Sequence, residues 1–160
     1  MEYVKLFNAL AQYQVRYLIC GGLAVNVYGI PRMTPDIDIL LDFEGGNLAN
    51  FEDAIKTLFY ENDFPVSLKK FSDADYRKKM IQEKNLIAYS FFNSVSGFVT
   101  LDVLLDTPIE FEKLWNNKTV KNAGGVSMNI VNIKDLIALK KYANRIQDQN
   151  DVLLLSKMIE

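Results

Sequence analysis

The stretch Gly21-Gly22-Leu23-Ala24-Val25-Asn26-Val27-Tyr28-Gly29, followed after Pro31-Arg32-Met33-Thr34-Pro35 by Asp36-Ile37-Asp38-Ile39, decides the fold of this 160-residue chain. It predicts a glycine turn between a strand and a short helix, and then a second strand. Asp36 and Asp38 are two positions apart on that strand, so both carboxylates point to one face. Two such carboxylates repel each other unless a cation lies between them. A glycine turn at a helix start offers backbone N–H groups to a phosphate. The two features together predict nucleotide chemistry.

The residue types that the chain lacks narrow this chemistry further. There is no histidine, which excludes histidine-dependent triads, histidine general bases and histidine-based metal sites. The single cysteine, Cys20, excludes an internal disulfide and a cysteine-based zinc site, and we expect it to be a small buried hydrophobe. The carboxylates that remain suit hard cations such as Mg²⁺ or Mn²⁺.

Bulk composition predicts one soluble domain. A hydrophobic fraction of 49% over 160 residues is enough for a real core. The net charge of −2 gives no general attraction to nucleic acid, so DNA is not an expected partner and RNA would need a local patch. No apolar run reaches the roughly 18 residues that span a bilayer, and the N-terminus does not resemble a secretory signal. We therefore expect a cytoplasmic protein without a membrane partner.

The periodicity of apolar residues predicts strands and helices that alternate. The fold class is α+β (α/β), with a mixed central β-sheet flanked by helices and with C-terminal helices. Residues 1–131 form the core, and residues 132–160 form a helical segment packed on it as part of one compact domain. We expect a turn at 45–47 and an antiparallel hairpin of 86–92 with 98–105 joined by 93–97. Helices are expected at 3–13, 23–28, 48–60, 73–83, 109–115, 135–141 and 151–155, and further strands at 16–20, 37–41, 119–121 and 126–131.

A third carboxylate lies inside an apolar strand. Asp102 interrupts the run from Val99 to Leu105, and a buried carboxylate is costly unless it is paired or bound to a metal. If its strand lies beside that of Asp36 and Asp38, the three carboxylates share one edge of the sheet. They could then hold two divalent cations about 4 Å apart, as phosphoryl-group transfer needs.

These residues resemble those of a known superfamily. The order Gly-Gly, helix, Asp-Ile-Asp and a later strand with a central aspartate is similar to the DNA polymerase beta-type nucleotidyltransferases. The longer string from Gly21 to Asp38 resembles small bacterial nucleotidyltransferases related to the AbiEii toxins of toxin–antitoxin and abortive-infection systems. Their C-terminal signature is matched by Asp135-Leu136-Ile137-Ala138-Leu139-Lys140, followed by Arg145, Asp148 and Asp151.

The resemblance implies a nucleotidyltransferase fold and a role for each matching residue. Asp36, Asp38 and Asp102 would be the catalytic metal ligands for two ions, and Asp102 would also help to deprotonate the acceptor. The residues implied to bind the nucleoside triphosphate are Gly21, Gly22, Arg32, Thr34 and Lys140, with Arg145 and Asp148 as possible additions.

Simpler interpretations of several of these residues stay open. Arg32 and Thr34 could brace the loop instead of contacting phosphates. Lys140 could reach solvent from the margin of a core helix, and Arg145 with Asp148 could be an i, i+3 surface pair. The chain also has Gly22 where many superfamily members have serine, and it is shorter than typical AbiEii-like members.

The expected activity is transfer of a nucleoside monophosphate from a nucleoside triphosphate to an acceptor hydroxyl, with release of pyrophosphate. The resemblance makes tRNA or a protein the expected acceptor, and a toxin paired with an antitoxin protein the expected setting. One alternative is modification of a small molecule such as an aminoglycoside, for which we expect an acidic pocket. Another is an inert nucleotide-binding module that acts through a partner protein, but such a module has no physical reason to keep three mutually repelling carboxylates.

Overall fold

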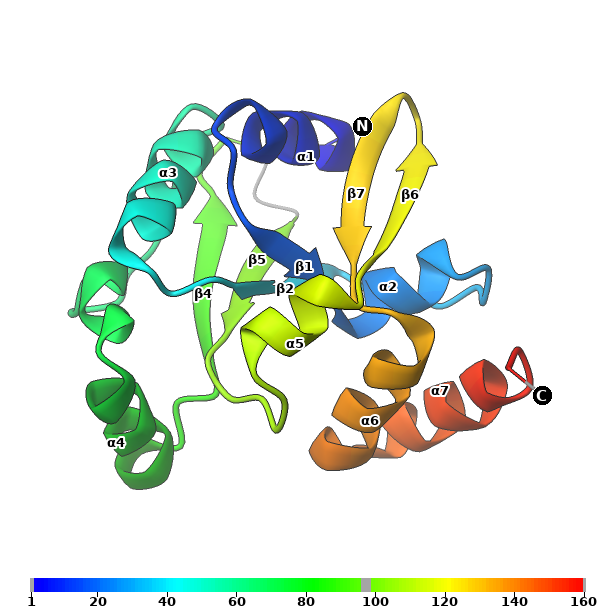
Figure 1. The fold of residues 1–160 in the computed structure, drawn as a ribbon. Helices are drawn as coiled ribbons and strands as arrows, with labels where there is room; N and C mark the ends of the chain where they lie inside the picture. The colour runs from blue at the N-terminus through cyan, green and yellow to red at the C-terminus, as the bar shows by residue number, and fades with distance from the viewer. Residues whose placement is uncertain (1, 96–98, 160) are drawn as a thin grey trace.

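A computed structural model describes residues 2–95 and 99–159 of the chain as a mixed sheet with helices around it (Figure 1). The strands are β1 (Tyr17–Ile19), β2 (Asp36–Leu41), β3 (Tyr60–Glu61), β4 (Ala88–Asn93), β5 (Thr100–Leu104), β6 (Thr119–Ala123) and β7 (Val126–Ile130). The helices are α1 (Glu2–Gln12), α2 (Gly21–Val27), α3 (Gly45–Lys56), η1 (Leu68–Ser72), α4 (Ala74–Lys84), α5 (Phe111–Asn116), α6 (Ile133–Ala143) and α7 (Ile146–Ser156).

The seven strands form one sheet in the order β3-β4-β5-β2-β1-β7-β6. The β2–β5 and β1–β7 pairs are parallel, whereas the other neighbours are antiparallel. The expected mixed sheet is therefore confirmed. The central position of β2 follows from its sequence, because Ile37, Ile39 and Leu41 are almost fully buried on one face.

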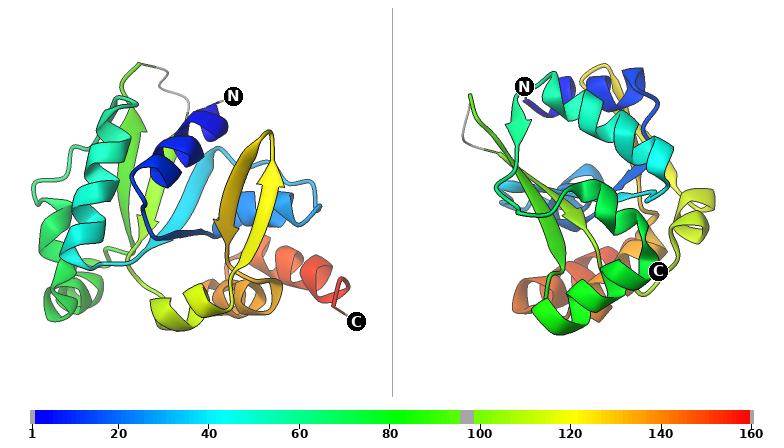
Figure 2. Two further views of the ribbon diagram at one scale, coloured as in Figure 1. Left: turned by 45° about the horizontal axis from the view of Figure 1, so that its top comes forward. Right: turned by 90° about the vertical axis from the view of Figure 1, so that its left-hand side faces the viewer.

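Helices lie on both sides of the sheet. α1 and α3 contact each other and lie together at one side, while α6 and α7 pack as a pair at the opposite side (Figures 1 and 2). The core joins these layers through large buried side chains such as Phe7, Tyr17, Phe51 and Tyr89. None of the helices in the described part of the chain is long and apolar enough to cross a membrane.

Two glycine pairs depart from the expectations. Gly21 and Gly22 form the first turn of α2 instead of a separate turn before it, and Gly45 and Gly46 likewise begin α3. α3 ends at Lys56, earlier than expected, and Phe59 then adopts a positive φ of 63° before β3. The hairpin of β4 and β5 is antiparallel as predicted. The expected turn and strand residues at 96–98 lie outside the described residues.

Candidate active site

Parallel pairing of β2 with β5 brings the three predicted carboxylates to one face of the sheet. Asp38 lies directly opposite Asp102 in the register, and Asp36 lies opposite Thr100. Residues two apart on a strand share a face, so Asp36, Asp38 and Asp102 all project to the same side. The predicted juxtaposition of the carboxylates is confirmed, because β5 is the direct neighbour of β2.

Burial and mutual repulsion raise the pKa of two of these carboxyls. Desolvation is the main cause for Asp38, and the charges of Asp102 and Asp36 raise its pKa further. The positive charge of Arg145 and the backbone N–H of Gly22 oppose this shift. Desolvation also raises the pKa of Asp102, aided by the charge of Asp36 and opposed by the Ser90 hydroxyl. Burial therefore makes the charged form of these two carboxyls unfavourable, and a bound cation would offset this cost.

The donor set fits a hard divalent cation. Asp102 Oδ1 is buried and lacks a hydrogen-bond partner within the described residues, and such a group needs a partner of some kind. Carboxylate oxygens are the ligands that Mg²⁺ and Mn²⁺ prefer. In the described ranges, however, no three acidic or cysteine side chains are already gathered round one point suited to a metal ion. The three carboxylates thus share a face without forming a closed ligand cluster.

The glycine pair is required by close packing next to these carboxylates. Gly21 has a φ of +62°, and a Cβ at that position would lie 1.8 Å from Asp38 Oδ2. A Cβ on Gly22 would lie 2.7 Å from Thr34 Oγ1. Both positions therefore exclude a side chain, and the Asp38 carboxylate lies directly against the start of α2.

The loop before β2 is held at both ends. Thr34 Oγ1 donates a hydrogen bond to the Asp36 carbonyl at 3.2 Å, and the Arg32 backbone N–H donates to Asn26 Oδ1 at 2.6 Å. The Arg32 guanidinium forms an ion pair with Asp151 on α7. Arg32 and Thr34 thus brace the loop in this structure, which is one of the two roles that their position allowed.

A buried ion cluster joins α6 to α7. Lys140 is only 4% exposed, and its Nζ lies 3.1 Å from Asp148 Oδ1 and 2.7 Å from Asp151 Oδ2. Asp148 is fully buried and also accepts a bond of 2.7 Å from Arg145 Nε. Lys140 therefore does not reach solvent, and the i, i+3 pair of Arg145 and Asp148 has only its arginine at the surface. Asp151, which sequence reasoning did not select as a site residue, completes the cluster.

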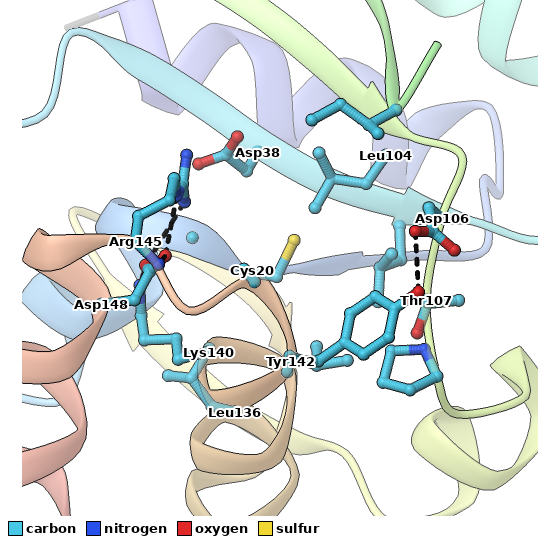
Figure 3. A pocket seen from close by; sticks show the side chains of 16 residues that line it. Cys20, Asp38, Leu104, Asp106, Thr107, Leu136, Lys140, Tyr142, Arg145 and Asp148 are labelled. Carbon is cyan, nitrogen blue, oxygen red and sulfur yellow. Dashed lines mark hydrogen bonds and ion pairs between the residues drawn. The ribbon is translucent and has the colours of Figure 1, made fainter. Parts of the chain in front are cut away.

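The balance of effects lowers the pKa of Asp148. Burial by itself raises it, but hydrogen bonds from Arg145 and Lys140, together with their charges, outweigh the desolvation. Arg145 is the exposed member of the cluster, with a side-chain exposure of 59%. In Figure 3 its side chain extends from Asp148 toward Asp38, and its charge lowers the pKa of Asp38. Arg145 thus links the ion cluster to the carboxylate face.

A cavity of about 550 Å³ opens beside Asp38 (Figure 3). At one end it is lined by Gly21, Asp38 and Arg145, and at the other by Asp106 and Tyr142. Its walls are mainly apolar and include Cys20, Leu40, Leu104, Leu136 and Leu139. Cys20 is 1% exposed, as expected, and burial raises the pKa of its thiol well above its ordinary value.

Sequence reasoning did not single out the far end of this cavity. The Tyr142 hydroxyl donates a hydrogen bond of 2.9 Å to Asp106 Oδ2. These residues are 36 positions apart, and neither lies in a recognisable motif. Only the folded chain brings the last turn of α6 close to the segment that follows β5.

Comparison with protein families decides the broad identity. Residues 1–160 match the profile of a family described as "Nucleotidyl transferase of unknown function (DUF2204)". The chain belongs to this nucleotidyltransferase family. Comparison with curated proteins gave no significant match.

Solved structures of nucleotidyltransferases share the fold. ANT(2″)-Ia, in complex with adenylyl-2″-tobramycin, aligns with a TM-score of 0.62 at 14% identity over 98% of this chain and 86% of that one. The lincosamide antibiotic adenylyltransferase LnuA, with lincomycin bound, aligns with a TM-score of 0.59 at 14% identity over 97% of this chain and 94% of that one. TM1012 from Thermotoga maritima, assigned to the nucleotidyltransferases, aligns with a TM-score of 0.55 at 13% identity over 97% of this chain and 88% of that one. At these identities the likeness shows that the DUF2204 chain has a nucleotidyltransferase fold.

Proposed function

We propose that this protein transfers a nucleoside monophosphate from a nucleoside triphosphate to an acceptor hydroxyl and releases pyrophosphate. The observation that carries the proposal is the direct register of Asp38 with Asp102 across parallel strands, with Asp36 on the same face. Membership of a nucleotidyltransferase family supports it independently.

The three aspartates are the proposed ligands of two divalent ions, Mg²⁺ or Mn²⁺. Such ions would neutralise charge on the triphosphate and lower the pKa of the attacking hydroxyl. The orphaned Asp102 Oδ1 and the raised pKa of Asp38 support this assignment. Gly21 and Gly22 are proposed to let the triphosphate approach the backbone at the start of α2.

The chain's own groups account for the movement of the proton and the leaving group. The acceptor oxygen attacks the α-phosphorus, and the bond from that phosphorus to the bridging β-phosphate oxygen breaks. The hydroxyl proton passes to the Asp102 carboxylate, which lies on the same face as Asp36 and Asp38. Pyrophosphate leaves with the bonding electron pair, and Arg145, whose charge acts on Asp38, is proposed to face the charge of the pyrophosphate.

The roles proposed for the remaining residues follow from their contacts. Lys140 and Asp148 orient Arg145 through the buried cluster, and Lys140 also lines the cavity. Lys140 would contact a phosphate itself only by sharing its ammonium with Asp148 and Asp151. Arg32 and Thr34 hold the loop that precedes Asp36.

Two acceptor classes are supported by different observations. The resemblance to AbiEii-like toxins favours tRNA or a protein, with an antitoxin as partner. The fold shared with enzymes seen with adenylyl-2″-tobramycin and lincomycin favours a small hydroxylated molecule. The acidic pocket expected for a cationic aminoglycoside is matched in part, because Asp38 and Asp106 line the cavity, whereas Asp148 is paired with Lys140 and Arg145.

The proposal is tested with α-³²P-labelled triphosphates and Mg²⁺, offered with bulk tRNA, with cell-lysate protein or with a panel of small hydroxylated molecules. Label transfer to any of these acceptors, abolished in Asp38→Ala, is the expected result. Asp53→Asn on the exposed surface of α3 is the matched control and should transfer label normally. Triphosphate binding without transfer to any acceptor would instead favour the inert module.

A further inference from the structure

We infer that the cavity beside Asp38 receives the nucleoside of the triphosphate, and that Asp106 selects a base with adjacent N–H donors on its pairing edge, guanine above all. This inference rests on the proposed function and adds a specificity-determining residue to it. It is carried by the residues that line the two ends of the cavity and by the Asp106–Tyr142 contact.

The cavity runs away from the groups proposed to surround the phosphates. Its inner end contains Asp38, Gly21 and Arg145, which are those groups. Asp36 and Asp102 do not line it. An acceptor activated by Asp102 would therefore approach from the side of β4 and β5. This leaves the cavity for the nucleoside, which is attached to the α-phosphate.

The spacing of the residues along the cavity suits a nucleoside. Asp102 lies opposite Asp38, and Asp106 follows four residues later, about 13 Å farther along an extended chain at roughly 3.3 Å per residue. A nucleoside whose phosphate lies at Asp38 would extend toward Asp106. Leu104 and Leu139 give the flat parts of such a ligand an apolar wall.

The far end of the cavity offers one carboxylate to a ligand. Asp106 Oδ2 accepts a hydrogen bond from the Tyr142 hydroxyl, which holds the carboxylate in place, and the Oδ1 atom offers a second acceptor in the cavity wall. The neighbouring Thr107 hydroxyl is already engaged by the Ile109 carbonyl and N–H, at 3.1 and 3.3 Å. Asp106 thus keeps hydrogen-bonding capacity for a ligand at this end of the cavity.

An ionised carboxylate only accepts hydrogen bonds, and it can accept two parallel ones. Guanine presents N1–H and the 2-amino group side by side, which matches this pattern. Adenine and cytosine present one amino group beside a ring acceptor, and uracil presents carbonyl oxygens on both sides of its single N–H. The carboxylate therefore favours guanine and disfavours uracil.

The test is the equilibrium binding of GTP, ATP, CTP and UTP with Mg²⁺ to the full chain, without acceptor. GTP should bind about 5- to 150-fold more tightly than UTP, as expected for one bidentate contact to a base. Asp106→Asn should remove most of this preference by weakening GTP binding, because the amide replaces one of the two acceptor oxygens by a donor. Tyr142→Phe should weaken GTP binding less than Asp106→Asn does, because it frees the Asp106 carboxylate without removing it. Asp53→Asn should leave the affinity for all four triphosphates unchanged.

The possible failures are distinguishable. Equal affinity for all four triphosphates, unchanged by Asp106→Asn, would overturn the inference and leave the proposed function standing. An Asp106→Asn variant with altered acceptor KM but unaltered triphosphate binding would assign the cavity to the acceptor and also overturn it. Failure of all four triphosphates to bind the wild-type chain would overturn both. Circular dichroism of each variant shows that it is folded before binding is compared.

Discussion

Replacing Lys140 by methionine tests the buried ion cluster most sharply. The change keeps the length of the side chain but removes an ammonium that is 4% exposed and lies 3.1 Å from Asp148 and 2.7 Å from Asp151. Removing one partner from a buried ion pair costs about 3–5 kcal/mol. Each carboxylate keeps an arginine, since Arg145 bonds to Asp148 and Arg32 to Asp151.

We therefore expect the lower end of that range, about 3 kcal/mol of the free energy of unfolding. For a chain of this size that loss corresponds to a fall of about 6–12 °C in the melting temperature. Urea denaturation followed by circular dichroism measures the free energy directly, and the slope against urea should stay unchanged. Lys141→Met is the matched control, because Lys141 is the next residue of α6 and is exposed.

The control should change stability by less than about 0.5 kcal/mol. If Lys140→Met were as stable as Lys141→Met, the cluster would not stabilise the fold, and α6 and α7 would be held together by other contacts. An equal loss in both variants would point to helix propensity or surface charge instead of the buried pairs.

Three further predictions concern the glycine turn and the titration of the carboxyls. Gly21→Ala should lower the free energy of unfolding, measured by urea denaturation, by more than about 1–2 kcal/mol, because φ is +62° and Asp38 occupies the space of a Cβ. Gly46→Ala should not lower it, because the space that a Cβ would enter there is open. Equal effects would contradict the close approach. Asp38→Asn should abolish transfer, yet it should raise the free energy of unfolding at pH 7 by about 0.5–2 kcal/mol, because the raised pKa of Asp38 marks an unfavourable charge. This gain in stability should shrink as the pH falls toward 3.8. Below that pH the wild-type carboxyl is protonated in both the folded and the unfolded state. Asp148 has a lowered pKa, so Asp148→Asn should be less stable than the wild type at pH 7. The difference in the free energy of unfolding should narrow only as the pH falls below 3.8. A difference that does not narrow there would refute the lowered pKa of Asp148.

The carboxylate face could be predicted from the sequence, because it depends on local periodicity and on one strand pairing. An aspartate inside the apolar run of β5 has few physical explanations, and a partner strand with two more aspartates is the simplest. The mixed sheet and the C-terminal helices followed from the same alternation of apolar residues. The family profile then supported the nucleotidyltransferase resemblance, although not its AbiEii-like subtype.

The ion cluster and the cavity could not be predicted in the same way. Whether Lys140 reaches solvent or is buried depends on Asp151 of the next helix and on Arg32, which is 119 residues from Asp151. Such contacts leave no periodic signal. The contact of Asp106 with Tyr142 is equally non-local, so the far end of the cavity became visible only in the folded chain.

A paired labelling experiment decides whether these carboxylates catalyse nucleotidyl transfer. The chain is incubated with Mg²⁺, an acceptor that it modifies, and one triphosphate labelled either at the α- or at the γ-phosphate. We expect the α label alone to appear on the acceptor and the γ label to appear in pyrophosphate, and we expect Asp102→Asn to stop both. Transfer of the γ label to the acceptor, or undiminished transfer by Asp102→Asn, would contradict the proposed chemistry.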